Sequence, residues 1–364
     1  MEQENISLLN VNEMVAMLSK AYISLIEKDI PFRKFPSVML WGAPGVGKSQ
    51  GVRQIADAVE ARTGKKVKIT DVRLLLFNPI DLRGIPTANA DKTLAVWLKP
   101  QIFQMDESRD VVNILFLDEI SAAPQSVQAA AYQITLDRTV GEHKLPENCI
   151  VIAAGNRVSD KSVAFKMPRA LANRLCHFEI EVNAESWHEW AINSGVNEKV
   201  CGFIDYKPNL LLESDESASD LAYATPRSWE MVSNILNSVS DNVVDVLPLI
   251  VGCIGSVSAY EFLLWTEVYN KTPDVDDIFS GATEKVPTRP EILYALTSKI
   301  YGAVKKHMTA EEINNLIAYA EKLPIEFKSR VYTDLLKQKK IYPILQNNKS
   351  FNYWYLRNGN SWDD

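Results

Sequence analysis

Hydrophobic positions along this chain follow two patterns, and the change between them falls near residue 183. Before that point, short apolar runs typical of buried strands alternate with helical stretches and turns. The strand-like runs are residues 37–41, 66–72, 111–117, 148–154 and 177–182. This alternation predicts an α/β fold in which helices lie on both faces of a parallel sheet. One covering helix should span residues 12–28, where apolar residues recur at helical spacing.

After this change the strand signals largely stop, and the remaining segments have a helical pattern. An acidic, serine-rich stretch at 213–220 indicates an exposed loop, and prolines with acidic residues at 271–290 indicate a linker. We therefore expect an α/β core at residues 1–183, an all-α lid domain at 184–270, and a linker with a helical C-terminal extension at 271–364.

Composition and charge narrow the classes of protein that fit this pattern. The 364 residues are 46% hydrophobic and 23% charged, which is enough apolar material for a sizeable core. The net charge of −7 argues against a global attraction to nucleic acid or to an anionic membrane, although a local basic groove is compatible with it. No stretch of about 18 consecutive apolar residues occurs, so we expect no membrane span.

Neither the cysteines nor the histidines follow a metal-binding pattern. Cys149, Cys176, Cys201 and Cys253 are far apart, with no spacing of a zinc site and no dense disulfide framework. The four histidines are also scattered, and we expect them to be surface or hydrogen-bonded polar residues. Because the first ten residues are polar and acidic, unlike a secretory signal, we expect a cytoplasmic protein.

The strongest chemical signal follows the first strand-like run. Residues 42–49 match the pattern G-x-x-x-x-G-K-[ST] between a strand and a helix. In such a loop, backbone N–H groups and the helix N-terminus face phosphates, the lysine reaches the β- and γ-phosphates, and the hydroxyl binds Mg²⁺. The sequence therefore predicts that ATP and Mg²⁺ are bound by Gly42, Ala43, Pro44, Gly45, Val46, Gly47, Lys48, Ser49 and Gln50.

A second signal lies about 70 residues downstream, where the apolar run 113–117 ends in Asp118 and Glu119. On its own, a strand followed by two acids is usually a solvated strand end. Together with the phosphate-binding loop, Asp118 is predicted to hold Mg²⁺, which retains much of its water shell in proteins. Glu119 is then placed to orient or deprotonate the attacking water.

These motifs and three further segments resemble AAA+ ATPases over residues 35–236. The run 148–156 is similar to the sensor 1 strand of that family, and the resemblance implies that Asn156 reads the γ-phosphate and positions water. The segment 167–175, which contains Arg169 and Arg174, resembles the arginine-finger segment. The segment 224–228 resembles sensor 2, where Arg227 opens the lid helix and reaches the γ-phosphate of its own subunit.

Within AAA+, the chain resembles the MoxR-type, helix-2-insert ATPases most. The likeness lies in residues 71–100, which contain the run Pro79-Ile-Asp-Leu-Arg83, and in residues 136–147. It implies an insertion in the second core helix and a hairpin before sensor 1, both near the pore of a six-membered ring. Whether the pore-side segments 71–100 and 138–147 contact a substrate does not follow from it, and the role of residues 287–364 is not accounted for.

An arginine supplied by a neighbouring subunit would tie hydrolysis to assembly, because its charge stabilises the transition state. Arg174 is the first candidate for this trans-acting finger, and Arg169 the second. The alternative is structural: either arginine could cap the preceding helix or pair with an acid such as Glu179.

The resemblance implies a homo-oligomeric, hexameric ring that hydrolyses MgATP to remodel, mature or assemble a client protein, with a partner that carries a von Willebrand A domain. One alternative is a motor on nucleic acid, as in restriction systems or helicases, against which the acidic balance argues. Others are a nucleotide-gated scaffold and, as the weakest, a small-molecule kinase. The aromatic residues at 351–355 are expected to seal a hydrophobic surface or to dock on a neighbour.

Overall fold

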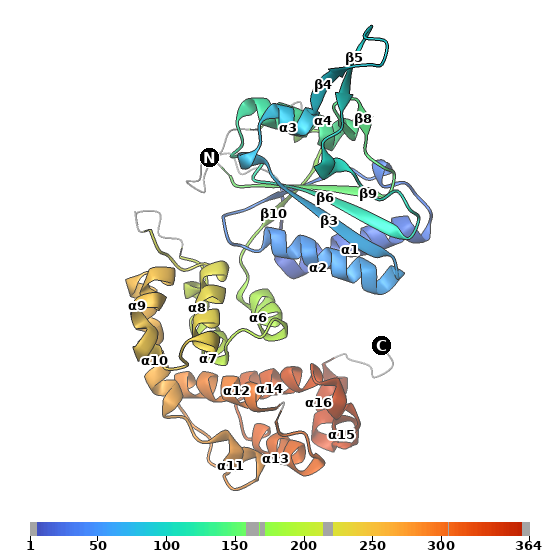
Figure 1. Ribbon diagram of the computed structural model, residues 1–364. Coiled ribbons are helices and arrows are strands. Elements are labelled where there is room, and N and C mark those ends of the chain that lie inside the picture. The colour runs from blue at the N-terminus through green and yellow to red at the C-terminus, as the bar shows by residue number, and fades with distance from the viewer. Residues whose placement is uncertain (1–5, 158–166, 168–171, 214–220, 305, 359–364) are drawn as a thin grey trace. The chain divides into compact units, whose positions relative to one another are not determined.

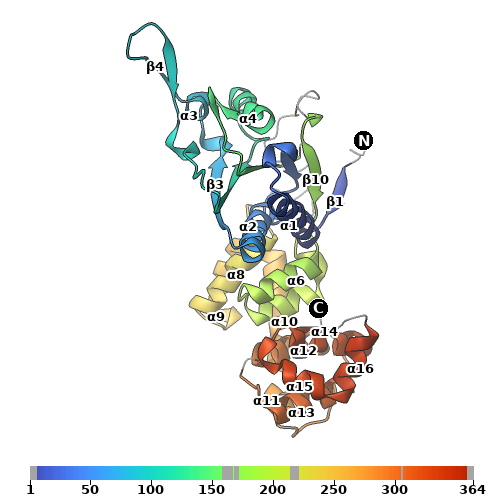
Figure 2. The ribbon, with the colours of Figure 1, turned by 90° about the vertical axis from the view of Figure 1, so that its right-hand side faces the viewer.

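The computed structural model describes residues 6–157, 167, 172–213, 221–304 and 306–358. The chain divides into two compact units, residues 1–186 and 187–364, and each is described by itself (Figures 1 and 2).

A six-stranded sheet forms the centre of the first unit, with strand order β1-β10-β2-β9-β6-β3. Every pairing within it is parallel. Its strands are β1 (Ser7–Leu9), β2 (Val38–Trp41), β3 (Lys66–Arg73), β6 (Val111–Asp118), β9 (Cys149–Gly155) and β10 (Cys176–Ile180). Because all strands run the same way, their carboxyl ends lie along one edge of the sheet.

Helices lie on both faces of this sheet, which confirms the predicted fold class (Figure 1). On one face, α1 (Val11–Glu27) and α2 (Lys48–Thr63) pack on a cluster that includes Ile114 and Phe116. On the other, α4 (Gln125–Asp137) packs on a cluster that includes Leu115 and Leu117. Since alternate residues of a strand point to opposite faces, β6 must be apolar at nearly every position, and residues 111–117 are all buried.

Two irregular segments lie on the α4 side of this unit. One follows β3 and contains η2 (Leu74–Leu76), α3 (Pro79–Arg83), the hairpin of β4 (Ile85–Ala88) with β5 (Ala95–Leu98), and η3 (Gln101–Phe103). The other is the short hairpin of β7 (Thr139–Val140) with β8 (His143–Lys144). The segments touch each other, since His143 Nε2 lies 2.8 Å from the Trp97 carbonyl oxygen. A Cβ on Gly141 would also come within 2.6 Å of the Arg83 carbonyl oxygen, so glycine is needed there.

The second unit is helical throughout its described residues, apart from turns. Its elements are α6 (Ala184–Asn193, which begins at the end of the first unit), α7 (Glu198–Tyr206), η5 (Pro208–Leu210), α8 (Pro226–Ser238), α9 (Val243–Ile254), α10 (Ser256–Asn270), α11 (Val275–Phe279), α12 (Pro290–Val304), α13 (Ala310–Ala320), α14 (Ile325–Leu336), η6 (Lys339–Ile341), α15 (Tyr342–Asn347) and α16 (Lys349–Arg357). None of these helices has both the length and the apolar character needed to cross a bilayer.

Helix α12 packs closely on α7 and joins the two predicted parts of this helical region. Ser298 on α12 donates a hydrogen bond to the carbonyl oxygen of Glu198, at 2.5 Å. A Cβ on Gly202 would lie 2.7 Å from the Ser298 Cβ, so the close approach requires glycine. The predicted boundary at residue 270 thus falls inside one compact unit, and the division into a lid and an extension stays a prediction.

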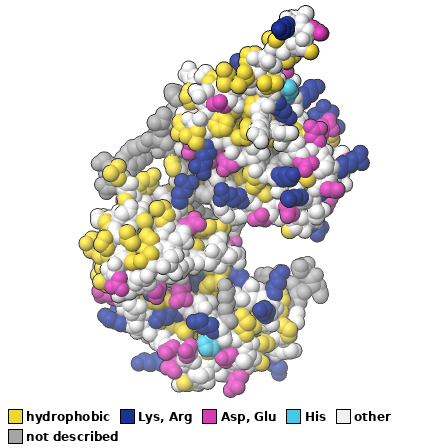
Figure 3. Space-filling view, in the orientation of Figure 1, with side chains coloured by type: hydrophobic (Ala, Val, Ile, Leu, Met, Phe, Trp, Pro, Cys, Tyr) yellow, Lys and Arg dark blue, Asp and Glu magenta, His cyan; other side chains and the backbone are white. Residues whose placement is uncertain are grey.

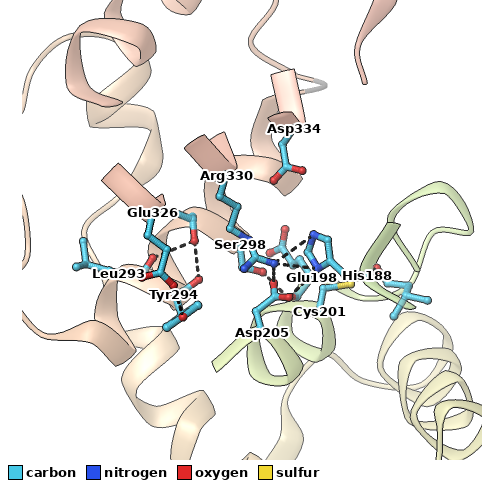
Figure 4. Close-up of polar contacts among 12 residues, drawn as sticks. His188, Glu198, Cys201, Asp205, Leu293, Tyr294, Ser298, Glu326, Arg330 and Asp334 are labelled. Atoms are coloured by element: carbon cyan, nitrogen blue, oxygen red, sulfur yellow. Dashed lines mark hydrogen bonds and ion pairs between the residues drawn. The ribbon is translucent and has the colours of Figure 1, made fainter. Parts of the chain in front are cut away.

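A buried charged cluster links three helices of this unit (Figure 4). Asp205 on α7 has a side chain only 7% exposed, and its Oδ1 lies 2.8 Å from Nδ1 of His188 on α6. Its other oxygen forms an ion pair with Arg330 on α14, whose NH2 also lies 3.1 Å from His188 Nδ1. One carboxylate therefore connects the consecutive helices α6 and α7 to α14, which comes much later in the sequence.

We expect Asp205→Asn to lower the free energy of unfolding of the protein by about 2–3 kcal/mol, because the Arg330 guanidinium would lose its buried counter-charge. Denaturant unfolding followed by circular dichroism measures this loss. Glu267→Gln, an exposed position on α10 of the same unit, is the matched control and should change stability little. Equal effects of the two substitutions would contradict a structural role for the cluster.

Candidate active site

The loop between β2 and α2 has the backbone form that phosphate binding requires. Gly42, Gly45 and Gly47 have φ angles of 151°, 81° and 105°, which L-residues with side chains rarely adopt. A Cβ on Gly42 would lie 2.7 Å from the carbonyl oxygen of Ile180, so a side chain does not fit there. The loop leads directly into the N-terminus of the 16-residue helix α2, where backbone N–H groups and the helix dipole favour an anion.

Lys48 connects this loop to the end of β9. Its side chain is largely buried, and its Nζ donates hydrogen bonds to the carbonyl oxygens of Gly42, at 2.5 Å, and Ala43, at 3.0 Å. The same Nζ lies 3.1 Å from Asn156 Oδ1. Lys48 and Asn156, which are both predicted to face the γ-phosphate, are thus within hydrogen-bonding distance of each other.

Ser49 and Asp118 form the second contact of the site. Ser49 Oγ donates to Asp118 Oδ2 at 3.1 Å, and the backbone N–H of Glu119 donates to Asp118 Oδ1 at 2.9 Å. A hydroxyl beside a carboxylate is the hard oxygen pair that suits Mg²⁺, with phosphate oxygens and water completing its coordination. These residues fit the predicted metal. Among the described residues, no group of three or more His, Cys, Asp or Glu side chains is placed to hold a metal ion by itself.

Glu119 stands in a left-handed turn, with a φ angle of 59°. This conformation is uncommon for a residue other than glycine and is held here by its surroundings. The Ala122 N–H donates to the Glu119 carbonyl oxygen, and the Ile120 N–H donates to that of Ala154, both at 3.0 Å. Backbone hydrogen bonds therefore hold the turn after β6 to β9 and to the residues that follow it in the chain.

Ser121 is a site residue that sequence reasoning missed. Its Oγ accepts a hydrogen bond from the backbone N–H of Asn156 at 2.9 Å. It is 3% exposed, and a Cβ on Gly155 would lie 2.8 Å from its Oγ. Ser121 thus joins the turn that carries Glu119 to the residue that contacts Lys48.

Asp71 adds negative charge beside Asp118. The β3–β6 register pairs Arg73 with Asp118 and Asp71 with Phe116, which puts Asp71 and Asp118 on one face of the sheet. Partial burial raises the pKa of the Asp71 carboxyl, and the charge of Asp118 raises it further, whereas Arg73 and Arg53 lower it. Asp71 therefore lies close enough to Asp118, Arg73 and Arg53 for their charges to act on its carboxyl.

The structure places the three candidate arginines differently. Arg169 lies outside the described residues. Arg174 is exposed and makes no ion pair with the described part of the chain, while Glu179, its predicted alternative partner, pairs with Arg157 instead. Arg227 is exposed in the first turn of α8, where Thr225 is the N-cap and Pro226 the first helical residue. It belongs to the helical unit, so its predicted approach to the γ-phosphate stays a prediction.

Comparisons with known proteins agree with this reading of the first unit. Residues 37–177 match the model of the ATPase family associated with various cellular activities (AAA). Among curated proteins, no sequence matches the chain. The matched region contains the phosphate-binding loop, Asp118, Glu119 and Asn156, so the first unit has an AAA+ type P-loop core.

Several solved structures are similar to this chain, with low sequence identity and low TM-scores. Caenorhabditis elegans PCH-2 is 13% identical, with 70% of this chain and 67% of that chain covered, and a TM-score of 0.36. A mutant of Thermotoga maritima RuvB is 16% identical, with 91% and 90% covered, and a TM-score of 0.35. A chain of the Escherichia coli MS115-1 HORMA:CdnC:Trip13 complex is 18% identical, with 72% and 89% covered, and a TM-score of 0.34.

Proposed function

We propose that this protein is an AAA+ ATPase that binds MgATP at the loop between β2 and α2 and hydrolyses it. One observation carries the proposal. Lys48 and Ser49, at the start of α2, form hydrogen bonds with Asn156 and Asp118, at the ends of two other strands. Phosphate-binding, metal-binding and water-positioning groups therefore meet at one edge of the sheet.

Each residue has a role that its position supports. When ATP binds, Lys48 would give up a hydrogen bond to a backbone carbonyl oxygen and bind phosphate oxygens instead. Ser49 and Asp118 would hold Mg²⁺. Bound Mg²⁺ neutralises charge on the phosphoryl group being transferred. Glu119 accepts the proton of the attacking water, and Asn156, held through its N–H by Ser121, keeps that water in position.

The finer part of the proposal concerns assembly and the client. We propose a MoxR-type ring, hexameric and cytoplasmic, in which the exposed Arg174 reaches the neighbour's nucleotide. The two touching segments 71–100 and 138–147 would face its pore. Such a ring would use hydrolysis to remodel, mature or assemble a client protein, together with an adaptor such as one with a von Willebrand A domain.

Lys48→Ala tests nucleotide binding. We expect ATP affinity to fall about tenfold to a hundredfold, because a charge-assisted hydrogen bond contributes about 1.5–3 kcal/mol. Calorimetric titration with a slowly hydrolysed ATP analogue and Mg²⁺ measures this change. Lys20→Ala, at an exposed position of α1, is the matched control and should bind normally. Unchanged affinity in a folded Lys48→Ala protein would refute the assignment of the nucleotide site.

A further inference from the structure

A pocket of about 710 Å³ lies between α14 and α16 in the helical unit, and none of its lining residues belongs to the candidate active site. This volume is in the range of ligand-binding clefts. The residues that line it are Glu321, Ile325, Lys328, Ser329, Lys349, Ser350, Tyr353, Trp354, Arg357 and Asn358.

The two helices that form the pocket are held together by aromatic packing. The Tyr332 ring on α14 lies 4.9 Å from the Phe351 ring and 5.2 Å from the Trp354 ring, both on α16. Trp354 Nε1 also donates a hydrogen bond to Ser329 Oγ at 3.3 Å. Phe351 is fully buried and Trp354 packs against the core, so this part of the pocket wall is fixed by the fold.

The charge of the pocket is opposite to that of the whole chain. Its lining contains three cations, Lys328, Lys349 and Arg357, and one acid, Glu321. The Glu321 carboxylate already accepts a hydrogen bond from the Tyr332 hydroxyl at 2.6 Å and lies 3.5 Å from Lys328 Nζ. The whole chain has a net charge of −7, but the pocket has a local surplus of positive charge. This surplus would attract an acidic group.

Apolar side chains are exposed beside these cations. Ile325 is 69% exposed and Tyr353 67% exposed at the pocket, and Leu356, three residues after Tyr353 on α16, is 60% exposed. Lys349, Tyr353 and Arg357 follow one another at intervals of four residues, so they share one face of α16. Hydrophobic and basic side chains lie next to each other in this part of the helical unit (Figure 3). Exposed apolar groups together with arginine are typical of interaction surfaces.

We propose that this pocket binds an acidic peptide segment of a partner protein, in which carboxylates flank one aromatic or large aliphatic side chain. The apolar side chain would contact Ile325 and Tyr353, while the carboxylates would pair with Lys349 and Arg357. A small inorganic anion would leave the apolar wall exposed, and the basic and aromatic groups extend along about 12 Å of α16, which suits a peptide. A nucleic acid is the alternative occupant, and the oligonucleotide in the experiment below tests it.

The probe for this proposal is a fluorescein-labelled peptide with one tryptophan between pairs of aspartates, and the full-length protein is titrated into it. Fluorescence anisotropy should show binding that weakens at least tenfold when the aspartates are replaced by asparagines, and that weakens with added salt. Lys349→Glu and Tyr353→Ala should each weaken binding about tenfold. Lys340→Glu and Tyr260→Ala, exposed positions of the same unit outside the pocket, are the matched controls and should not.

Three results would overturn the proposal. The first is no binding of the acidic peptide, or equal binding of the asparagine peptide. The second is a single-stranded oligonucleotide that binds more tightly than the peptide and loses affinity in the same variants. The third concerns residues 359–364, which include Trp362, Asp363 and Asp364 and have the same chemistry as the probe. If the peptide binds only after these residues are deleted, the chain itself supplies the ligand and no partner is needed.

Discussion

Arg174→Ala should slow ATP hydrolysis by about 10³- to 10⁵-fold while ATP binding stays nearly normal, if Arg174 acts as other arginine fingers do. The reason is that its charge would stabilise the transition state in a neighbouring subunit and would contribute little to ground-state binding. Arg174 is exposed and forms no ion pair with the described residues, so it is available for this contact. Steady-state hydrolysis and equilibrium binding of the same preparation measure the two effects separately.

Mixing Arg174→Ala with Lys48→Ala subunits distinguishes a finger that acts between subunits from a structural arginine. In a mixed ring, an intact phosphate-binding loop can face an intact arginine across one interface, so some activity should return. Specific activity of the wild-type protein should also rise with its concentration, because ATP bound at an interface favours assembly. If mixed oligomers form and no activity returns, Arg174 does not act in trans.

Glu119→Gln should retain binding of MgATP and lose turnover by about 10²- to 10⁴-fold, which is the usual contribution of a general base. Glutamine has the shape of glutamate but cannot accept the proton. It should also tolerate the left-handed backbone at this position as well as glutamate does, so the fold should be unaffected. Single-turnover hydrolysis with saturating ATP measures the chemical step directly.

The matched control for this substitution is Glu107→Gln, at an exposed position before β6, which should hydrolyse ATP at the wild-type rate. Near-normal turnover of Glu119→Gln would remove Glu119 from the mechanism. The inactive protein also tests the proposed client interaction. If the proposed ring forms, ATP held without hydrolysis should retain a client for longer and allow the client to be isolated.

Much of the sheet could be predicted from the sequence because its central strands are buried on both faces. β6 and β9 are almost continuously apolar, and such runs are easy to recognise. The strands that were missed lack this signal. β1 has only three residues, and all four residues of β4 are exposed, so neither shows a buried pattern.

In the site, too, residues that belong to a local sequence motif could be predicted, whereas a residue whose role depends on strand pairing could not. A motif of consecutive residues predicted Lys48 and Ser49, and the end of an apolar run, taken together with that motif, predicted Asp118 and Glu119. Ser121 was missed because a single serine in a turn has no distinctive pattern, and its importance depends on β9 lying next to β6.

The aromatic residues near the end of the chain illustrate the limit of sequence reasoning. Residues 351–355 were expected to seal a surface or to dock on another protein, and the structure shows that they differ in burial. Phe351 is buried in the core of the helical unit, whereas Tyr353 is 67% exposed beside the basic residues of the pocket. Only the position of α16 relative to α14 distinguishes them.

The order of strands in the sheet has a consequence for synthesis of the chain on the ribosome. β10 lies between β1 and β2, and Ser7 is paired with Phe178. β1 can therefore pair within the sheet only after β10 has been synthesised. At about 5–20 residues per second, β1 would wait on the order of ten seconds. A nascent chain that stops before Cys176 leaves the edge of β2 unpaired, and such edges are where incomplete chains associate wrongly.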